Sequence, residues 1–159
     1  MKAIQISKLF VSLLLPLGIG AIAGIFTAKD IPEWYATLHQ PTFNPPNWVF
    51  GPVWTTLYIL LGISFFMVWK LEANKERNRA ILIFIAQLLL NFAWSFFFFY
   101  FKRIGVALID IVALWLMIVV MLVHFHRLKP LAMYINIPYL LWVAFATALN
   151  VAYFWLNRS

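Results

Sequence analysis

Long apolar runs alternate with short polar segments along the whole chain. Each run is about 20 residues long, and the charged residues gather between the runs. A helix of this length crosses the ~30 Å hydrocarbon core of a bilayer, because each residue adds ~1.5 Å. Runs such as VALWLMIVVMLV show no period-two alternation, which argues against a membrane barrel. The pattern predicts five helices, at about 5–27, 47–70, 79–101, 104–126 and 131–155.

The predicted fold is therefore an all-α integral membrane protein, a five-transmembrane-helix bundle forming a single domain over residues 1–159. The composition agrees, because 65% of the residues are hydrophobic and 11% are charged, whereas a soluble domain has roughly 25% charged residues. The first apolar run continues through about Phe26 without a convincing signal-peptide cleavage site, so we expect a retained first span. No internal repeat is convincing, so an inverted-repeat transporter is not expected.

The net charge of +7 does not indicate nucleic-acid binding, because the basic residues lie in the short segments and form no stripe. One set of segments carries eight basic residues: Lys2, Lys8, Lys70, Lys75, Arg77, Arg79, Arg127 and Lys129. The other set carries four: Lys29, Lys102, Arg103 and Arg158. For a bacterial cytoplasmic-membrane protein, this bias predicts a cytoplasmic N-terminus and an outside C-terminus. Contact with anionic lipid is also expected.

The stretch WYATLHQPTFNPPNWVFGPVW, residues 34–54, holds three Trp and four Pro. It begins in the long loop 28–46 and continues into the second span. Two interpretations are open. The rings can form an aromatic belt at the bilayer interface. Alternatively, the loop is a lid over a pocket mouth, since prolines hold neighbouring rings in a fixed arrangement. The belt does not explain the prolines.

Polar residues inside the third span lie on one face. Gln87, Asn91 and Ser95 are spaced four apart, a spacing that puts side chains on the same side of a helix. Such groups either join helices by hydrogen bonds or line a ligand cavity. The pattern leaves both interpretations open. An amide, which donates and accepts hydrogen bonds, would suit a ligand carbonyl or carboxylate.

Small residues create two further candidate features. In the fifth span, Ala146 follows Trp142 by one turn and shares a face with Leu149, which permits either close helix packing or room for a flat ligand beside the indole. In the first span, Gly20 and Gly24 form a G-x-x-x-G pair. This pair permits close approach to another helix, within the protomer or across a dimer.

Asp110 is the one carboxylate well inside a predicted span, about two turns after Lys102 and Arg103. We expect either an ion pair with one of these bases or a proton or cation site. The sequence otherwise offers little for conventional catalysis. It contains no Cys, and no Ser/His/Asp set, paired carboxylates or phosphate loop is evident.

Three histidines raise the question of metal or haem ligation. His39 lies in the loop 28–46, whereas His124 and His126 are expected at the opposite membrane face. The three cannot bind one metal together, so no metal site is predicted. His39 as a single axial haem ligand stays open.

Four motifs together carry a resemblance that covers nearly the whole chain. They are WYxxLxxPxFxPPxWxFxPVWxxLY at 34–58, QLxLNxxWS at 87–95, ALxD at 107–110 with LW at 114–115, and PYLxWxxFAxxLN at 138–150. Their order and spacing resemble the TspO/MBR family of translocator proteins, also called tryptophan-rich sensory proteins or peripheral-type benzodiazepine receptors. The resemblance implies a five-helix bundle, commonly a homodimer.

The resemblance also implies a pocket near the loop 28–46. This pocket would bind protoporphyrin IX, haem-like tetrapyrroles and isoquinoline-carboxamide or benzodiazepine-type ligands, with porphyrin as ligand or substrate and no required cofactor. The implied ligand-binding residues are Tyr35, Phe50, Trp54, Gln87, Asn91, Trp94, Ser95, Trp142, Ala146 and Leu149.

Three function classes remain: a binding sensor, an enzyme and a transporter. For bacterial members the resemblance implies light-dependent breakdown of protoporphyrin IX, and the hypothesis for this chain places Trp54 and Trp142 in catalytic roles. The alternative is a transporter of tetrapyrroles or other apolar molecules such as sterols. The cholesterol motif of eukaryotic relatives is broken here at Val151 and Trp155, which puts sterol transport in doubt.

Overall fold

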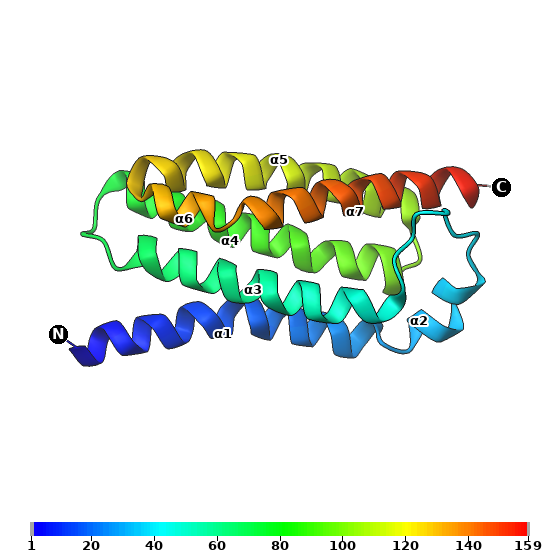
Figure 1. Ribbon diagram of the computed structural model, residues 1–159, viewed down its shortest axis with the longest axis horizontal. Helices are drawn as coiled ribbons and strands as arrows, with labels where there is room; N and C mark the ends of the chain where they lie inside the picture. Colours follow the sequence, from blue (N-terminus) through cyan, green and yellow to red (C-terminus); the bar gives the residue numbers. More distant parts are fainter. Residues whose placement is uncertain (1, 159) are drawn as a thin grey trace.

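Five long apolar helices run side by side along the molecule (Figure 1). The computed structural model describes residues 2–158, and among these it contains no strand. The helices are α1 (Lys2–Thr27), α3 (Asn47–Trp69), α4 (Lys75–Ser95) continued by the π-helix η2 (Phe96–Tyr100), α5 (Ile104–Leu128), and α6 (Pro130–Tyr134) followed by α7 (Ile137–Leu156). Each of the five spans has 23 to 27 residues, enough to cross a bilayer. The prediction of an all-α, five-span membrane protein is confirmed.

The third span begins earlier than predicted. The expected start was near residue 79, but α4 begins at Lys75. Asn74 caps the helix, because its side-chain oxygen accepts a hydrogen bond from the backbone N–H of Arg77 at 2.8 Å. An asparagine in this position satisfies one of the free N–H groups of the first turn. The charged first turn is therefore helical.

The fifth span is two helices where one was predicted. A short turn at Ile135 and Asn136 separates α6 from α7. Pro138 lies in the first turn of α7, where its missing N–H costs nothing, whereas inside a continuous helix it would remove a hydrogen bond. The Asn136 side chain donates to the carbonyl of Ala132 at 2.8 Å, which satisfies one group freed by the break.

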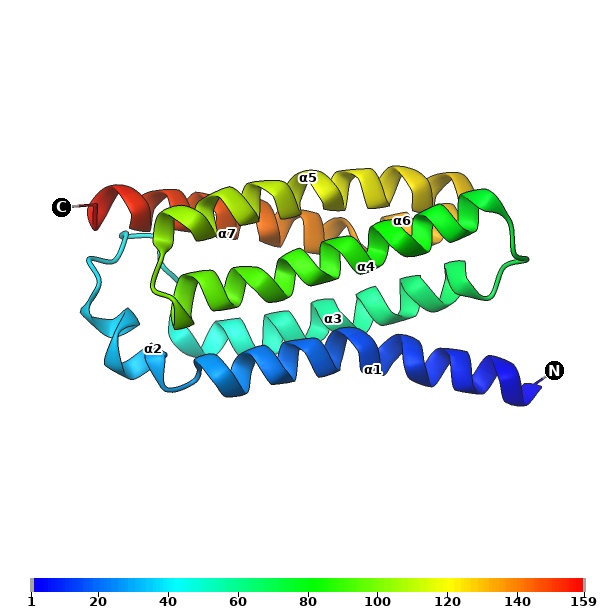
Figure 2. The same ribbon diagram turned by 180° about the vertical axis from the view of Figure 1, so that it is seen from behind.

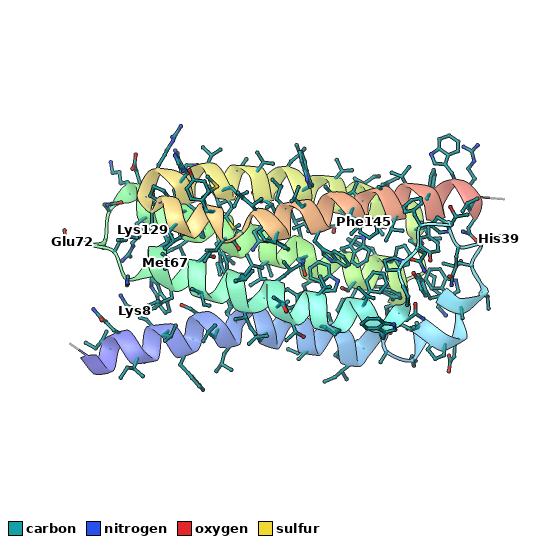
Figure 3. All side chains as sticks on the ribbon, viewed as in Figure 1. Lys8, His39, Met67, Glu72, Lys129 and Phe145 are labelled. Carbon is teal, nitrogen blue, oxygen red and sulfur yellow. The ribbon has the colours of Figure 1, made fainter. Side chains whose placement is uncertain are left out.

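The half of the bundle near the N-terminus is solidly packed. Phe65 stacks on Phe84 with ring centroids 4.2 Å apart, and the rings of Phe84 and Phe125 are nearly parallel with centroids 6.3 Å apart. Helices α1 and α3 are in backbone contact here, since a Cβ placed on Gly62 would lie 2.8 Å from the Ser12 carbonyl oxygen. Lys8, Glu72 and Lys129 mark this end in Figure 3.

The loop 28–46 covers the other end of the bundle, where the C-terminus also lies (Figure 2). It contains a short helix, α2 (Asp30–Glu33), and a 3-10 helix, η1 (Tyr35–Thr37), before an extended segment leads into α3. This extended segment passes beside the end of α7 (Figure 1). The loop is thus an ordered cap over one end of the bundle.

Candidate ligand-binding cavity

A cavity of about 560 Å³ lies beneath the loop, in the half of the bundle opposite the stacked phenyl rings. Four spans and the loop contribute to its wall. The residues that line it are Leu17, Gly20, Ala21, Ala23, Gly24 and Thr27 from α1; Ile31 and Tyr35 from the loop; Asn47, Phe50, Gly51, Trp54, Thr55 and Tyr58 from α3; Asn91, Trp94, Ser95, Phe98 and Phe99 from α4 and η2; and Trp142, Ala146, Leu149, Asn150 and Tyr153 from α7.

Aromatic rings in contact with one another form much of this wall. The Trp54 indole stacks on the Tyr58 ring with centroids 5.4 Å apart. Across the seam between α3 and α7, Phe50 meets Trp142 edge to face at 6.0 Å. Such pairs hold each other in place and present flat apolar faces. The two indoles Trp54 and Trp142 therefore share one cavity, on different helices.

The remaining rings belong to α4 and the π-helix that follows it. Trp94 stacks on Phe98 at 5.4 Å, and its indole N–H donates to the side-chain oxygen of Asn150 at 2.9 Å. Asn150 also donates to the backbone carbonyl of Ile104 at 3.1 Å. Asn150 therefore joins α7 to both Trp94 and the start of α5, which fixes this corner of the cavity.

A chain of buried hydrogen bonds forms the floor of the cavity. The Tyr58 hydroxyl donates to the side-chain oxygen of Asn91 at 2.7 Å, and the Asn91 amide donates to the Tyr139 hydroxyl at 3.1 Å. Tyr139 in turn donates to Gln87 Oε1 at 2.8 Å. The network joins α3, α4 and α7, as polar groups inside a membrane bundle commonly do.

This network resolves the two interpretations of the polar face on α4. Gln87 is buried, is hydrogen-bonded to Tyr139, and does not line the cavity. Asn91 serves both purposes, since it hydrogen-bonds to two tyrosines and also borders the cavity, and Ser95 borders the cavity one turn further on.

Nine of the ten residues that the resemblance implied as ligand-binding line this one cavity, and Gln87 is the exception. The sequence interpretation missed the contribution of α1. Gly20 is close to the Tyr58 ring, so that a Cβ there would collide with it, whereas Gly24 faces open space. The G-x-x-x-G spacing was the available signal, but it was interpreted as helix packing alone.

Tyr35 fastens the loop to α7. Its hydroxyl accepts a hydrogen bond from Tyr153 at 2.7 Å and donates to the side-chain oxygen of Asn44 at 3.1 Å. Burial raises the pKa of the Tyr35 hydroxyl above its ordinary value, because the charged form loses its hydration. Tyr35 thus stays a neutral donor and acceptor between the loop and the bundle.

A second attachment joins the loop to the chain end. The Asn157 side chain accepts from the backbone N–H of His39 at 2.9 Å and donates to the His39 carbonyl at 3.1 Å. His39 itself lies at the outer end of the molecule (Figure 3) and does not line the cavity. Among residues 4–158, no group of three His, Asp or Glu side chains is placed to hold a metal ion.

The expected ion pair of Asp110 is wrong. Lys102 pairs with Asp30 of the loop, at 3.4 Å between Nζ and Oδ1. Lys102 lies in the turn between η2 and α5 with a φ of 56°, and this turn faces the loop. Asp110 Oδ2 is buried with no hydrogen-bond partner among residues 4–158, and Asp110 does not line the cavity.

Fold and site together define a class: a small membrane protein of five spans with an aromatic cavity capped by an ordered loop. The TspO/MBR family profile matches residues 12–156, and the chain belongs to this family. A tryptophan-rich protein TspO from Archaeoglobus fulgidus is 41% identical over 154 residues, covering 96% of this chain and 99% of that protein.

Two further relatives span bacteria and mammals. The tryptophan-rich sensory protein of Cereibacter sphaeroides is 36% identical over 149 residues, covering 94% of this chain and 91% of that protein. The human translocator protein is 39% identical over 121 residues, covering 74% of this chain and 71% of that protein. The likeness to the microbial proteins thus extends over nearly the full length.

Proposed function

We propose that this protein is a membrane receptor that binds flat, largely apolar small molecules, with porphyrins such as protoporphyrin IX and haem-like tetrapyrroles foremost. Isoquinoline-carboxamide and benzodiazepine-type compounds would occupy the same cavity. The observation that carries the proposal is the cavity of about 560 Å³ walled by aromatic rings. Its volume lies within the ~300–1,000 Å³ range of small-molecule pockets.

The chemistry of the wall supports this class of ligand. Trp54, Phe50 and Trp142 offer ring faces for offset stacking against a conjugated system. The wall also carries polar groups, among them the Asn91 amide and the Ser95 hydroxyl. These groups would orient a ligand carbonyl or carboxylate.

Receptor function is favoured over transport by the solid half of the bundle. The stacked rings of Phe65, Phe84 and Phe125 fill the space that a passage to the opposite membrane face would need. A transporter would therefore have to repack its core in every cycle. We also propose a homodimer in a bacterial cytoplasmic membrane. The loop 28–46 would lie outside, because the basic residues are more numerous on the opposite side of the membrane.

The test is a visible absorption titration of the purified protein with protoporphyrin IX, in darkness and under illumination. Saturable binding with a shifted Soret band that stays stable under illumination would support the receptor. Loss of that band in light, with a new absorption band, would support the enzyme, in which an excited porphyrin exchanges an electron with indole or activates oxygen. Absence of saturable binding would contradict both.

The indoles of the cavity are tested with matched variants. In the double variant Trp54→Phe/Trp142→Phe two of the three cavity indoles are lost, Trp94 is kept, and ring contacts are partly kept. The control is Trp48→Phe/Trp155→Phe, because these indoles are 75% and 55% exposed and do not line the cavity. Weaker binding or lost photochemistry in the first variant alone would assign the role to the cavity pair. Equal photobleaching in both variants would exclude a chemical role of Trp54 and Trp142.

A further inference from the structure

The loop closes the cavity at the end of the bundle. Three attachments hold it there: the ion pair of Asp30 with Lys102 at 3.4 Å, the hydrogen bond of Tyr153 to Tyr35 at 2.7 Å, and the two bonds of Asn157 to the His39 backbone. Lys102 lies in the turn between η2 and α5, Tyr153 lies in the last turn of α7, and Asn157 follows the end of α7. A ligand entering along the bundle axis would have to break several of them.

Two seams between helices are closed by aromatic contacts. Between α1 and η2, the rings of Phe26 and Phe96 lie 5.8 Å apart. Between α3 and α7, Phe50 meets Trp142 at 6.0 Å, and Phe43 of the loop meets Phe145 of α7 at 6.3 Å. These sides offer no gap without movement of large rings.

The seam between α1 and α3 is different. These two helices lie side by side in both views (Figures 1 and 2). All exposed residues that line the cavity belong to them: Ala21, Gly24, Asn47, Gly51 and Thr55. These residues place the cavity next to the outer surface of the bundle along this seam. The lining residues of α4, η2, α7 and the loop are buried or half-buried.

The opening results from the small size of the residues along this seam. Deeper in the bundle, the helices touch at Gly20, next to the Tyr58 ring, and at Gly62, next to the Ser12 backbone. Towards the loop they no longer fill the space between them, since a Cβ on Gly24 or on Gly51 would meet no atom within 4 Å.

The opening faces the side of the bundle. Thr55 is eight residues inside α3 and Ala21 is six residues from the end of α1, which places them ~12 Å and ~9 Å along their helices at ~1.5 Å per residue. The neighbouring outward residues of α1 are apolar, and Ile25 is 76% exposed. In a bundle that spans a bilayer, such a surface meets lipid chains.

We propose that the ligand enters and leaves the cavity from the lipid bilayer, through a lateral opening between α1 and α3 lined by Ala21, Gly24, Gly51 and Thr55. This inference rests on the proposed binding function and adds that the ligand comes from the lipid bilayer. It selects molecules that partition into the membrane and are flat enough to pass between two helices. The loop then serves as a fixed cap and is not the entrance.

The experiment measures binding kinetics of protoporphyrin IX in liposomes, by stopped-flow quenching of tryptophan fluorescence. Because the chain contains no Cys, the variants Thr55→Cys and Gly51→Cys each supply one thiol. A bulky methanethiosulfonate is attached after folding and removed by reductant. The control is Ile25→Cys, which is exposed on α1 but does not line the cavity.

We expect modification at Thr55→Cys or Gly51→Cys to slow both association and dissociation by about tenfold with little change in Kd, because a narrowed passage acts on both rates. Reductant should restore the rates, which also shows that the variants are folded. Modified Ile25→Cys and the loop variant Asn157→Ala should keep the unmodified rates. If modification at both opening positions left the binding rates unchanged, and if Asn157→Ala bound and released the ligand faster, the lateral route would be wrong. The receptor function would then still stand. Absence of saturable binding to the unmodified protein would overturn the route and the receptor function together.

Discussion

Tyr139 joins the two amides of α4. Its hydroxyl accepts a hydrogen bond from Asn91 and donates one to Gln87, while Asn91 accepts a second bond from Tyr58. All four side chains are buried. Each lost partner would leave a buried polar group without water to replace it, so the network keeps α3, α4 and α7 in register.

Removal of the two tyrosine hydroxyls should have unequal effects. Tyr139→Phe leaves groups on both Asn91 and Gln87 unpaired, whereas Tyr58→Phe leaves only an oxygen of Asn91 without its donor. At about 1–3 kcal/mol for each unpaired buried group, the Tyr139 variant should unfold at the lower temperature. Thermal unfolding in detergent measures both.

Tyr134→Phe is the control for this comparison, because the Tyr134 ring is 54% exposed. It should unfold close to the unmodified protein. Equal loss of stability in Tyr139→Phe and Tyr134→Phe would contradict a structural role of the network.

At the scale of single residues, the sequence predicted the types of residue better than the side chains that they contact. The spacing of Gln87, Asn91 and Ser95 correctly put them on one face of α4, but periodicity contains no distance to another helix. Only the packed structure shows that Gln87 accepts a hydrogen bond from Tyr139 and that neither side chain lines the cavity. The expected ion pair of Asp110 with Lys102 or Arg103 was wrong for the same reason, since Lys102 pairs with Asp30 of the loop.

Two glycines of α1 differ in their surroundings, because Gly20 lies against the Tyr58 ring of α3 whereas Gly24 has no neighbour there. Gly20→Ala should destabilise the protein, since the new methyl group would collide with the Tyr58 ring that is bonded to Asn91. Gly24→Ala meets no atom and should be neutral or stabilising by up to ~1 kcal/mol, because alanine favours helix. Thermal unfolding of the pair decides. A destabilised Gly24→Ala beside an unaffected Gly20→Ala would show that α1 packs in another rotation.

The loop 28–46 should depend more on Asn157 than on Lys102. Asn157→Ala removes two hydrogen bonds to the His39 backbone. Lys102→Ala removes an ion pair whose lysine is 44% exposed, and exposed pairs contribute only ~0–1 kcal/mol. Hydrogen–deuterium exchange of the loop should therefore rise clearly in Asn157→Ala and little in Lys102→Ala. Unchanged exchange in both would mean that Tyr35 and Tyr153 alone hold the loop.

The existence of each span followed from composition, whereas the start of α4 and the break before α7 did not. Asn74 and Pro138 are visible in the sequence, yet a cap or a break depends on how the chain turns at that point. An asparagine before a charged segment suits a loop as well as a helix start. The hydrophobic period identifies the middle of a helix because that part faces lipid or core, and it fades at the polar ends.

The whole molecule has an uneven distribution of basic residues, and this predicts its orientation. Lys8 and Lys129 lie at the end opposite His39 (Figure 3). With the richer side in the cytoplasm, alkaline phosphatase fused after the C-terminus should be active in a bacterial host, and a fluorescent protein fused there should be dark. The control is a fusion in the α3–α4 segment near Glu72, with the reverse result expected. Reversed signals at both sites would invert the topology.

The division of the bundle into a solid half and a hollow half has a consequence for its evolution. The stacked rings of Phe65, Phe84 and Phe125 stabilise the bundle, and none of them lines the cavity. Cavity residues outside the hydrogen-bond network of Tyr58 and Asn91 and the Gly20 contact can therefore diverge while this packing stays unchanged. A lineage can explore new chemical specificities on an unchanged foundation, and a single ancestral architecture can diversify into receptors whose ligands have little in common.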